Sequence, residues 1–133
     1  MKKLLVTSAV IEVGAGAGLL CCPSAVVALL LGSPLDTAAG FTLARVAGAA
    51  LLALGVACAL ARHDEQGSGG RSLVAGMAVY NLGAVIVFGM AAAQKQAVGI
   101  GLWPALGLHA AMAVWCLASL GRKSAVAQKT SSP

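Results

Sequence analysis

The sequence predicts an all-α protein that crosses a membrane four times, and three observations support this prediction. Hydrophobic residues make up 59% of the 133 residues and charged residues only 10%, whereas soluble domains carry about 25% charged residues. The apolar residues gather in four runs, each longer than the ~20 residues that a helix needs to cross the hydrocarbon core. Short polar stretches separate the runs, which is typical of antiparallel neighbours in a four-helix bundle.

The first apolar run, residues 4–31, is too long for one straight span, and its only charged residue is Glu12. Pro23 interrupts it, and proline both removes a helical hydrogen-bond donor and clashes with the preceding turn. We therefore expect a spanning helix over about 4–21 and a short interfacial helix over about 24–31. A single kinked and tilted helix is the alternative, and the sequence leaves both open.

The other three spanning helices are expected at about 38–61, 72–93 and 99–120. The first of these contains one charged residue, Arg45, and the last has His109 near its middle. Residues 124–133 are polar and predict a disordered cytoplasmic tail. The chain is thus expected to form a single transmembrane domain over residues 1–123, followed by this tail.

The basic residues between and beyond the helices predict the orientation. All but one lie on one side, where an excess of lysine and arginine marks the cytoplasm. They are Lys2, Lys3, Arg62, Arg71, Arg122, Lys123 and Lys129. The opposite side has only Lys95. We therefore expect a multi-pass protein of the inner (plasma) membrane with both termini in the cytoplasm and the lipid bilayer as its first partner.

Several classes of function find no support in the sequence. The formal charge of +5 does not indicate nucleic acid, because the basic residues form no stripe interleaved with aromatic residues. The four cysteines all lie within apolar runs, without the spacing of a disulfide framework or a metal site. They are Cys21, Cys22, Cys58 and Cys116. No nucleophile–base pair or cofactor motif stands out, so we predict no enzyme, catalytic residue, metal or cofactor.

Polar residues within the apolar runs are the candidates for a ligand or proton site, because an ionisable group in a bilayer is costly. With about 1.5 Å of rise per residue, Glu12, Asn81 and His109 lie about 13 to 16 Å from the predicted inner boundary. Tyr80 adjoins them, and Arg45 lies further out, at about 24 Å. One hypothesis is an interior site that moves protons or holds a polar head group. The other is a structural network in which Glu12 pairs with Arg45.

Glycines at helical spacing predict where the helices pack closely, since small residues let helix backbones approach. The candidates form one GxxxG motif on the first helix and one pair a heptad apart on each of the next two. They are Gly14 and Gly18, Gly48 and Gly55, and Gly76 and Gly83. The GxxxG motif could also contact a second copy of the chain.

One local stretch, Ser8-Ala9-Val10-Ile11-Glu12-Val13 followed by small residues, resembles the first helix of the small multidrug resistance transporters. The resemblance implies a short four-helix chain that works as an antiparallel dimer, with Glu12 as the shared proton and cation site. It covers one helix only. Aromatic residues that would bind an organic cation are scarce, and the strong charge bias disfavours the dual insertion that such a dimer needs.

A longer resemblance combines Pro23-Ser24 and the apolar residues up to Gly32 with residues 44–55, where Arg45 and Gly48 form an Arg-x-x-Gly pattern. These features are similar to the small DoxX-like bacterial membrane proteins. The resemblance implies four helices and, as in some members, action with larger membrane complexes or in redox stress.

Three functions therefore remain open. The leading prediction is a non-catalytic accessory or scaffold protein, or a ligand-binding membrane module, working in a larger complex or as a homo-oligomer. The first alternative is a proton-coupled transporter of small molecules that uses Glu12. The second is a membrane enzyme that acts on a lipid or quinone, with His109 and Glu12 as acid and base.

Overall fold

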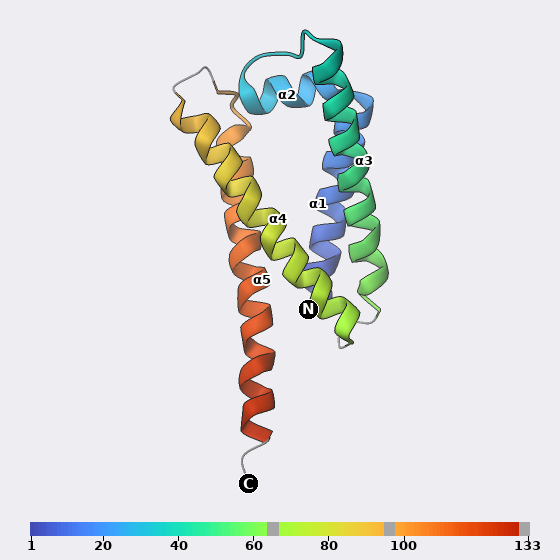
Figure 1. Cartoon of the computed structure of the whole chain (residues 1–133), viewed down its shortest axis with the longest axis vertical. Coiled ribbons are helices and arrows are strands. Elements are labelled where there is room, and N and C mark those ends of the chain that lie inside the picture. Colours follow the sequence, from blue (N-terminus) through green and yellow to red (C-terminus); the bar gives the residue numbers. More distant parts are fainter. Residues whose placement is uncertain (64–66, 95–97, 131–133) are drawn as a thin grey trace.

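The computed structural model describes residues 1–63, 67–94 and 98–130, with side chains as far as Gly121. This part of the chain is helical and contains no strand. Its five helices are α1 (Lys2–Cys21), α2 (Pro23–Leu31), α3 (Ala38–Ala61), α4 (Ser68–Ala93) and α5 (Leu102–Thr130) (Figure 1). The helices α1, α3 and α4 and the Leu102–Gly121 part of α5 are long and apolar enough to cross a membrane.

The break in the first apolar run produces a separate helix. Cys22 leaves the helical conformation, with φ −134° and ψ 56°, and Pro23 begins α2, where its missing N–H costs no hydrogen bond. The helix α2 has 9 residues and ends at Gly32, whose φ of 80° lies in the left-handed region that glycine adopts without strain. Figure 1 shows α2 lying across one end of the long helices. The alternative of a single kinked helix is therefore wrong.

The bounds of the long helices follow local hydrogen bonds. The helix α3 covers the predicted residues, and the Thr37 side chain caps it by accepting a hydrogen bond from the Gly40 amide at 3.1 Å. The helix α4 begins at Ser68, earlier than predicted. The helix α5 begins at Leu102 rather than near residue 99, because the amides of Gly99 and Gly101 donate to the α2 carbonyls of Leu30 and Leu29 instead.

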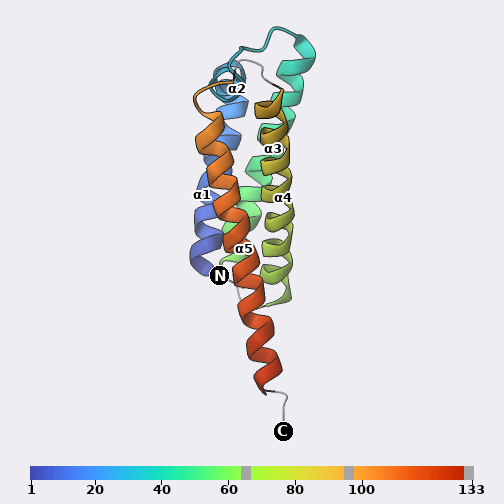
Figure 2. The same ribbon diagram turned by 90° about the vertical axis from the view of Figure 1, so that its left-hand side faces the viewer.

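Residues 124–130, predicted as a disordered tail, continue α5 as far as Thr130. Figure 2 shows this extension running beyond the ends of the other helices. The last predicted tail residues, 131–133, and Lys95 lie outside the described residues.

The long helices pack as two pairs, α1 with α3 and α4 with α5. Glycines bring the first pair together. A Cβ atom at Gly16 would lie 2.7 Å from the carbonyl oxygen of Gly48, and one at Gly55 would lie 2.7 Å from a methyl group of Val13. Both helix backbones therefore approach closely along this seam, as small residues permit.

The other glycines of the predicted packing set have different surroundings. A Cβ atom at Gly18 would lie 3.3 Å from Val26 of α2. A Cβ atom at Gly14, Gly76 or Gly83 would meet nothing within 4 Å. The packing role predicted for these last three glycines is therefore not found within the described chain.

The two pairs meet at the end where α1 begins. Buried residues of all four long helices form one cluster there: Leu4, Leu5, Ala9, Cys58, Val74, Met77, Ala78 and Cys116. Towards α2 the pairs diverge, as Figure 1 shows, and α2 lies across the space between them. This arrangement places the mid-helix residues of α1, α4 and α5 around an interior cavity.

Candidate functional site

A cavity of about 250 Å³ lies between the helix pairs and is lined by residues from all five helices. Most of its wall is aliphatic, with Phe88 as the apolar aromatic residue. The aliphatic residues are Ile11, Ala15, Leu19, Val26, Leu29, Leu30, Leu51, Ala105 and Leu108. Its polar residues are Glu12, Tyr80 and His109. The volume lies between the ~150 Å³ that accommodates benzene and the roughly 300 Å³ of the smallest drug-sized sites.

Glu12 is the polar lining residue whose carboxyl group has an oxygen without a hydrogen-bond partner. Its side chain is 2% exposed, and its Oε2 atom is buried without a hydrogen-bond partner. The Tyr80 side chain is hydrogen-bonded to the same carboxyl group, which ties α1 to α4. Because an unsatisfied polar atom in an apolar environment costs roughly 1–3 kcal/mol, this buried oxygen of a residue in the cavity wall requires an explanation.

Asn81 and His109 form a second polar contact beside it. The Asn81 amide nitrogen donates to the Met77 carbonyl oxygen at 2.8 Å, and its Oδ1 atom lies 2.8 Å from Nδ1 of His109. A carbonyl can only accept, so the Asn81 amide group must face Met77 and its oxygen must face His109. Nδ1 of His109 therefore carries a hydrogen, and in the neutral ring Nε2 is an acceptor.

Aromatic rings fix the orientation of the imidazole. The Tyr80 ring meets that of His109 edge to face, with centroids 5.6 Å apart, and the Phe88 ring lies at the same centroid distance. Aromatic pairs favour such separations. The predicted candidates Glu12, Tyr80, Asn81 and His109 are thus brought together from α1, α4 and α5.

Arg45 is not part of this group. Its side chain is exposed, whereas Glu12 is buried, so the alternative hypothesis in which Glu12 pairs with Arg45 inside the protein is wrong. The interior seam of α3 is formed by Gly48 and Gly55, whose contacts with the α1 backbone leave no space for a long side chain. Arg45 therefore lies on the exposed surface of α3 and is not among the residues that line the cavity.

Sequence reasoning missed Ser8 and Phe88. Ser8 is fully buried, its hydroxyl has no hydrogen-bond partner, and it lies one helical turn before Glu12. Residues four apart share a helix face, so the position of Ser8 relative to Glu12 was a usable signal. Phe88 gave no such signal, because a phenylalanine in an apolar helix is equally compatible with contact to lipid.

The cysteines divide into two groups. Cys58 and Cys116 are fully buried in the cluster at the start of α1, whereas Cys21 and Cys22 are exposed beside the α1–α2 break. Within the described residues, no group of three or more His, Cys, Asp or Glu side chains is placed to hold a metal ion.

The site can therefore offer a polar molecule a carboxyl oxygen, a phenol and an imidazole, within a wall that is otherwise hydrocarbon. Such a combination binds amphipathic molecules, since few polar groups orient a ligand that apolar contacts hold. It could also exchange protons, because carboxyl and imidazole groups are the usual carriers. Comparisons of the chain with protein-family models, with curated proteins and with solved structures give no match.

Proposed function

We propose that this protein is a membrane module that binds a small amphipathic molecule in the cavity at Glu12. The observation that carries the proposal is the buried Oε2 atom of Glu12, which has no hydrogen-bond partner and belongs to a residue of an apolar cavity wall. A bound hydrogen-bond donor would satisfy this oxygen. The cavity volume suits a molecule somewhat larger than benzene.

The proposal includes the membrane context. The four long helices form a four-helix bundle in the inner membrane, with both termini in the cytoplasm. Lys2 and Lys3 at the start of α1 and Arg62 after α3 support this orientation, because an excess of basic residues marks cytoplasmic loops. The start of α1, the end of α3 and the start of α4 lie at the same end of the molecule (Figure 1).

The experiment is to identify small molecules that stay with the protein. The chain is extracted gently from its own membrane, and native mass spectrometry is combined with chromatographic analysis of released lipids, quinones and other apolar compounds. We expect one class of molecule at near-stoichiometric amounts in the wild type. The same analysis identifies any partner protein or second copy, and thereby tests the accessory role in a larger complex.

Two variants make the result specific. Glu12→Leu removes the free oxygen and should abolish retention of the molecule. Val10→Leu is the matched control, because Val10 is on the same helix but 69% exposed, and it should retain the molecule. Equal retention by the wild type and Glu12→Leu, or no retained molecule in the wild type, would contradict the proposal.

Proton-coupled transport is the second candidate, and the same buried carboxyl group favours it. A carboxyl beside a tyrosine hydroxyl in a lipid-embedded cavity is the kind of group that carries protons in membrane proteins. Transport requires that a pH gradient across proteoliposomes drives uptake of the retained molecule. Glu12→Ala should abolish this uptake and Glu12→Asp should preserve part of it. Binding without gradient-driven uptake would leave the ligand-binding function and exclude this one.

A further inference from the structure

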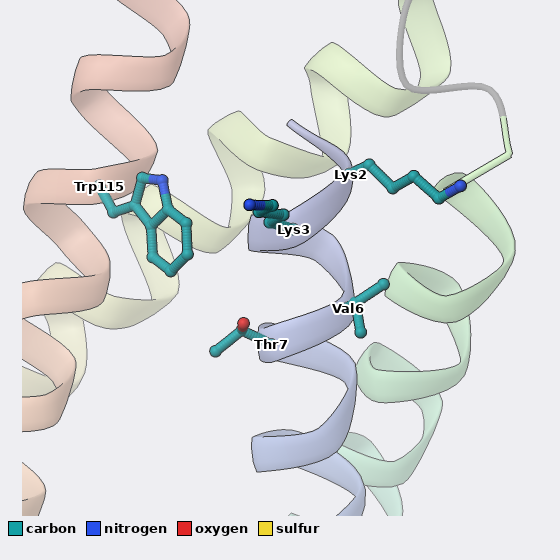
Figure 3. A pocket seen from close by; sticks show the side chains of 5 residues that line it. All are labelled: Lys2, Lys3, Val6, Thr7 and Trp115. Atoms are coloured by element: carbon teal, nitrogen blue, oxygen red, sulfur yellow. The ribbon is translucent and has the colours of Figure 1, made fainter.

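A second cavity lies at the other end of the molecule, in a groove between α1 and α5 near the start of α1. It has a volume of about 530 Å³ and is lined by Lys2, Lys3, Val6, Thr7 and Trp115. Figure 3 shows Lys3 and Thr7 extending from α1 toward the Trp115 ring of α5. The central site contains none of these residues, so the groove requires an explanation of its own.

The polar groups of the groove suit an anionic phosphate ester. Lys3 and Thr7 are four residues apart and therefore lie on one face of α1, one turn from each other. A lysine ammonium group binds phosphate as a point charge, and a threonine hydroxyl can donate a hydrogen bond to a phosphate oxygen. Lys2 also belongs to the lining, but its side chain extends away from Trp115 (Figure 3), and no acidic residue occurs among the described residues of the lining.

The apolar part of the groove suits a hydrocarbon chain. The stem of Lys3 adds methylene groups beneath its charge, next to the Trp115 ring. Val6 also belongs to the lining, but its side chain extends away from Trp115 (Figure 3). Trp115 is 41% exposed and lies about 9 Å from the end of the apolar part of α5 at Gly121. Tryptophan is enriched at this depth, where its ring contacts both acyl chains and head groups. A soluble phosphate compound would gain nothing from these apolar contacts.

We propose that this groove binds one anionic phospholipid, with its phosphate near Lys3 and Thr7 and the start of an acyl chain against the Trp115 ring. Grooves between membrane helices that contain basic residues at the membrane surface are suited to anionic head groups. The proposal does not depend on a ligand in the central cavity. It needs only that the membrane surface lies near the start of α1.

Fluorescence quenching tests the proposal, because brominated acyl chains quench a tryptophan only at contact. Trp103→Phe leaves Trp115 as the single tryptophan. This variant is reconstituted in phosphatidylcholine vesicles with equal mole fractions of brominated phosphatidylglycerol or brominated phosphatidylcholine. We expect Trp115 to show an about fivefold relative preference for phosphatidylglycerol, the factor that corresponds to about 1 kcal/mol for one basic residue near the membrane surface.

Substitutions then distinguish a specific phospholipid-binding site from the general electrostatic attraction of anionic lipids to a basic protein. In the same Trp103→Phe background, Lys3→Gln should lower the preference for phosphatidylglycerol over phosphatidylcholine to a ratio near one. Lys3→Arg should keep this preference, and Thr7→Val should weaken it. Trp115→Phe leaves Trp103, at the opposite end of the span, and this residue should show no preference. Equal quenching by both lipids at Trp115, a preference that survives Lys3→Gln, or the same preference at Trp103 would each overturn the proposal.

Discussion

Nδ1 of His109 lies 2.8 Å from Oδ1 of Asn81, and this contact joins α5 to α4 beside the central cavity. Asn81 is 1% exposed and its amide nitrogen is already engaged by the Met77 carbonyl. Each polar atom of the Asn81 side chain therefore has one specific partner. The contact engages only Nδ1 of His109, a residue that also belongs to the cavity wall.

Replacing Asn81 by Leu should destabilise the protein by about 1–3 kcal/mol, because Nδ1 of the half-buried His109 would then lose its hydrogen-bond partner. The free energy of unfolding can be measured by SDS titration in mixed micelles. The matched test is the double variant Asn81→Leu with His109→Phe, in which both polar partners are replaced by apolar groups. Its destabilisation should be smaller than the sum of the two single effects. Strictly additive effects would mean that the contact has no energetic role.

The glycine seam between α1 and α3 predicts a large difference between two glycine-to-alanine variants. In Gly16→Ala the new Cβ atom would lie 2.7 Å from the Gly48 carbonyl oxygen and 2.8 Å from the Leu52 amide nitrogen. Both are backbone atoms and cannot move aside cheaply, so we expect a loss of about 1–3 kcal/mol. In Gly76→Ala the Cβ atom meets nothing within 4 Å, and the higher helix propensity of alanine should stabilise the protein by up to about 1 kcal/mol.

The same SDS titration measures both variants. A Gly16→Ala protein as stable as the wild type would show that α1 and α3 do not approach as closely as described. A strongly destabilised Gly76→Ala protein would instead indicate that this exposed glycine packs against another chain.

The end of α2 depends on Gly99 and Gly101. Their amides donate to the carbonyl oxygens of Leu30 and Leu29 at 3.1 and 2.9 Å, and these carbonyls have no partner within the helix. A Cβ atom at Gly99 would overlap the Leu29 carbonyl group. Gly99→Ala should therefore detach the end of α2 and accelerate hydrogen exchange of the amides of residues 26–31 by at least about tenfold, which corresponds to about 1.4 kcal/mol.

The control is Gly89→Ala, since a side chain at Gly89 meets nothing within 4 Å. Hydrogen exchange monitored by mass spectrometry should leave α2 as protected in this variant as in the wild type. Unchanged protection in Gly99→Ala would show that the loop after α4 does not hold α2.

The helices and the depth of the site along them could be predicted from the sequence, because both follow from counting residues. Run length predicted the four long helices, and the proline rule predicted the break at Pro23. The rise per residue placed Glu12, Asn81 and His109 at one level. In the structure Glu12 and His109 line the cavity, and Asn81 contacts His109.

Helix rotation was not accessible from the sequence, because helices that are apolar all round have no polar face to mark the outward side. Arg45 was therefore expected to reach the interior, although it is exposed, and Gly76 and Gly83 were assigned to a seam that is not found within the described chain. The start of α5 was misplaced for another reason, since Gly99 and Gly101 bond to α2, a partner remote in sequence.

The two groups of cysteines allow a direct test of the fold and its orientation. Cys21 and Cys22 are exposed beside α2, whereas Cys58 and Cys116 are 0% exposed. In mild detergent a maleimide should label two thiols quickly and the other two only after denaturation. In intact cells a membrane-impermeant maleimide should label the wild type, because the proposed orientation places α2 at the outer surface. The Cys21→Ser, Cys22→Ser double variant should lose this labelling. Labelling of wild-type protein only in inverted vesicles would reverse the proposed orientation.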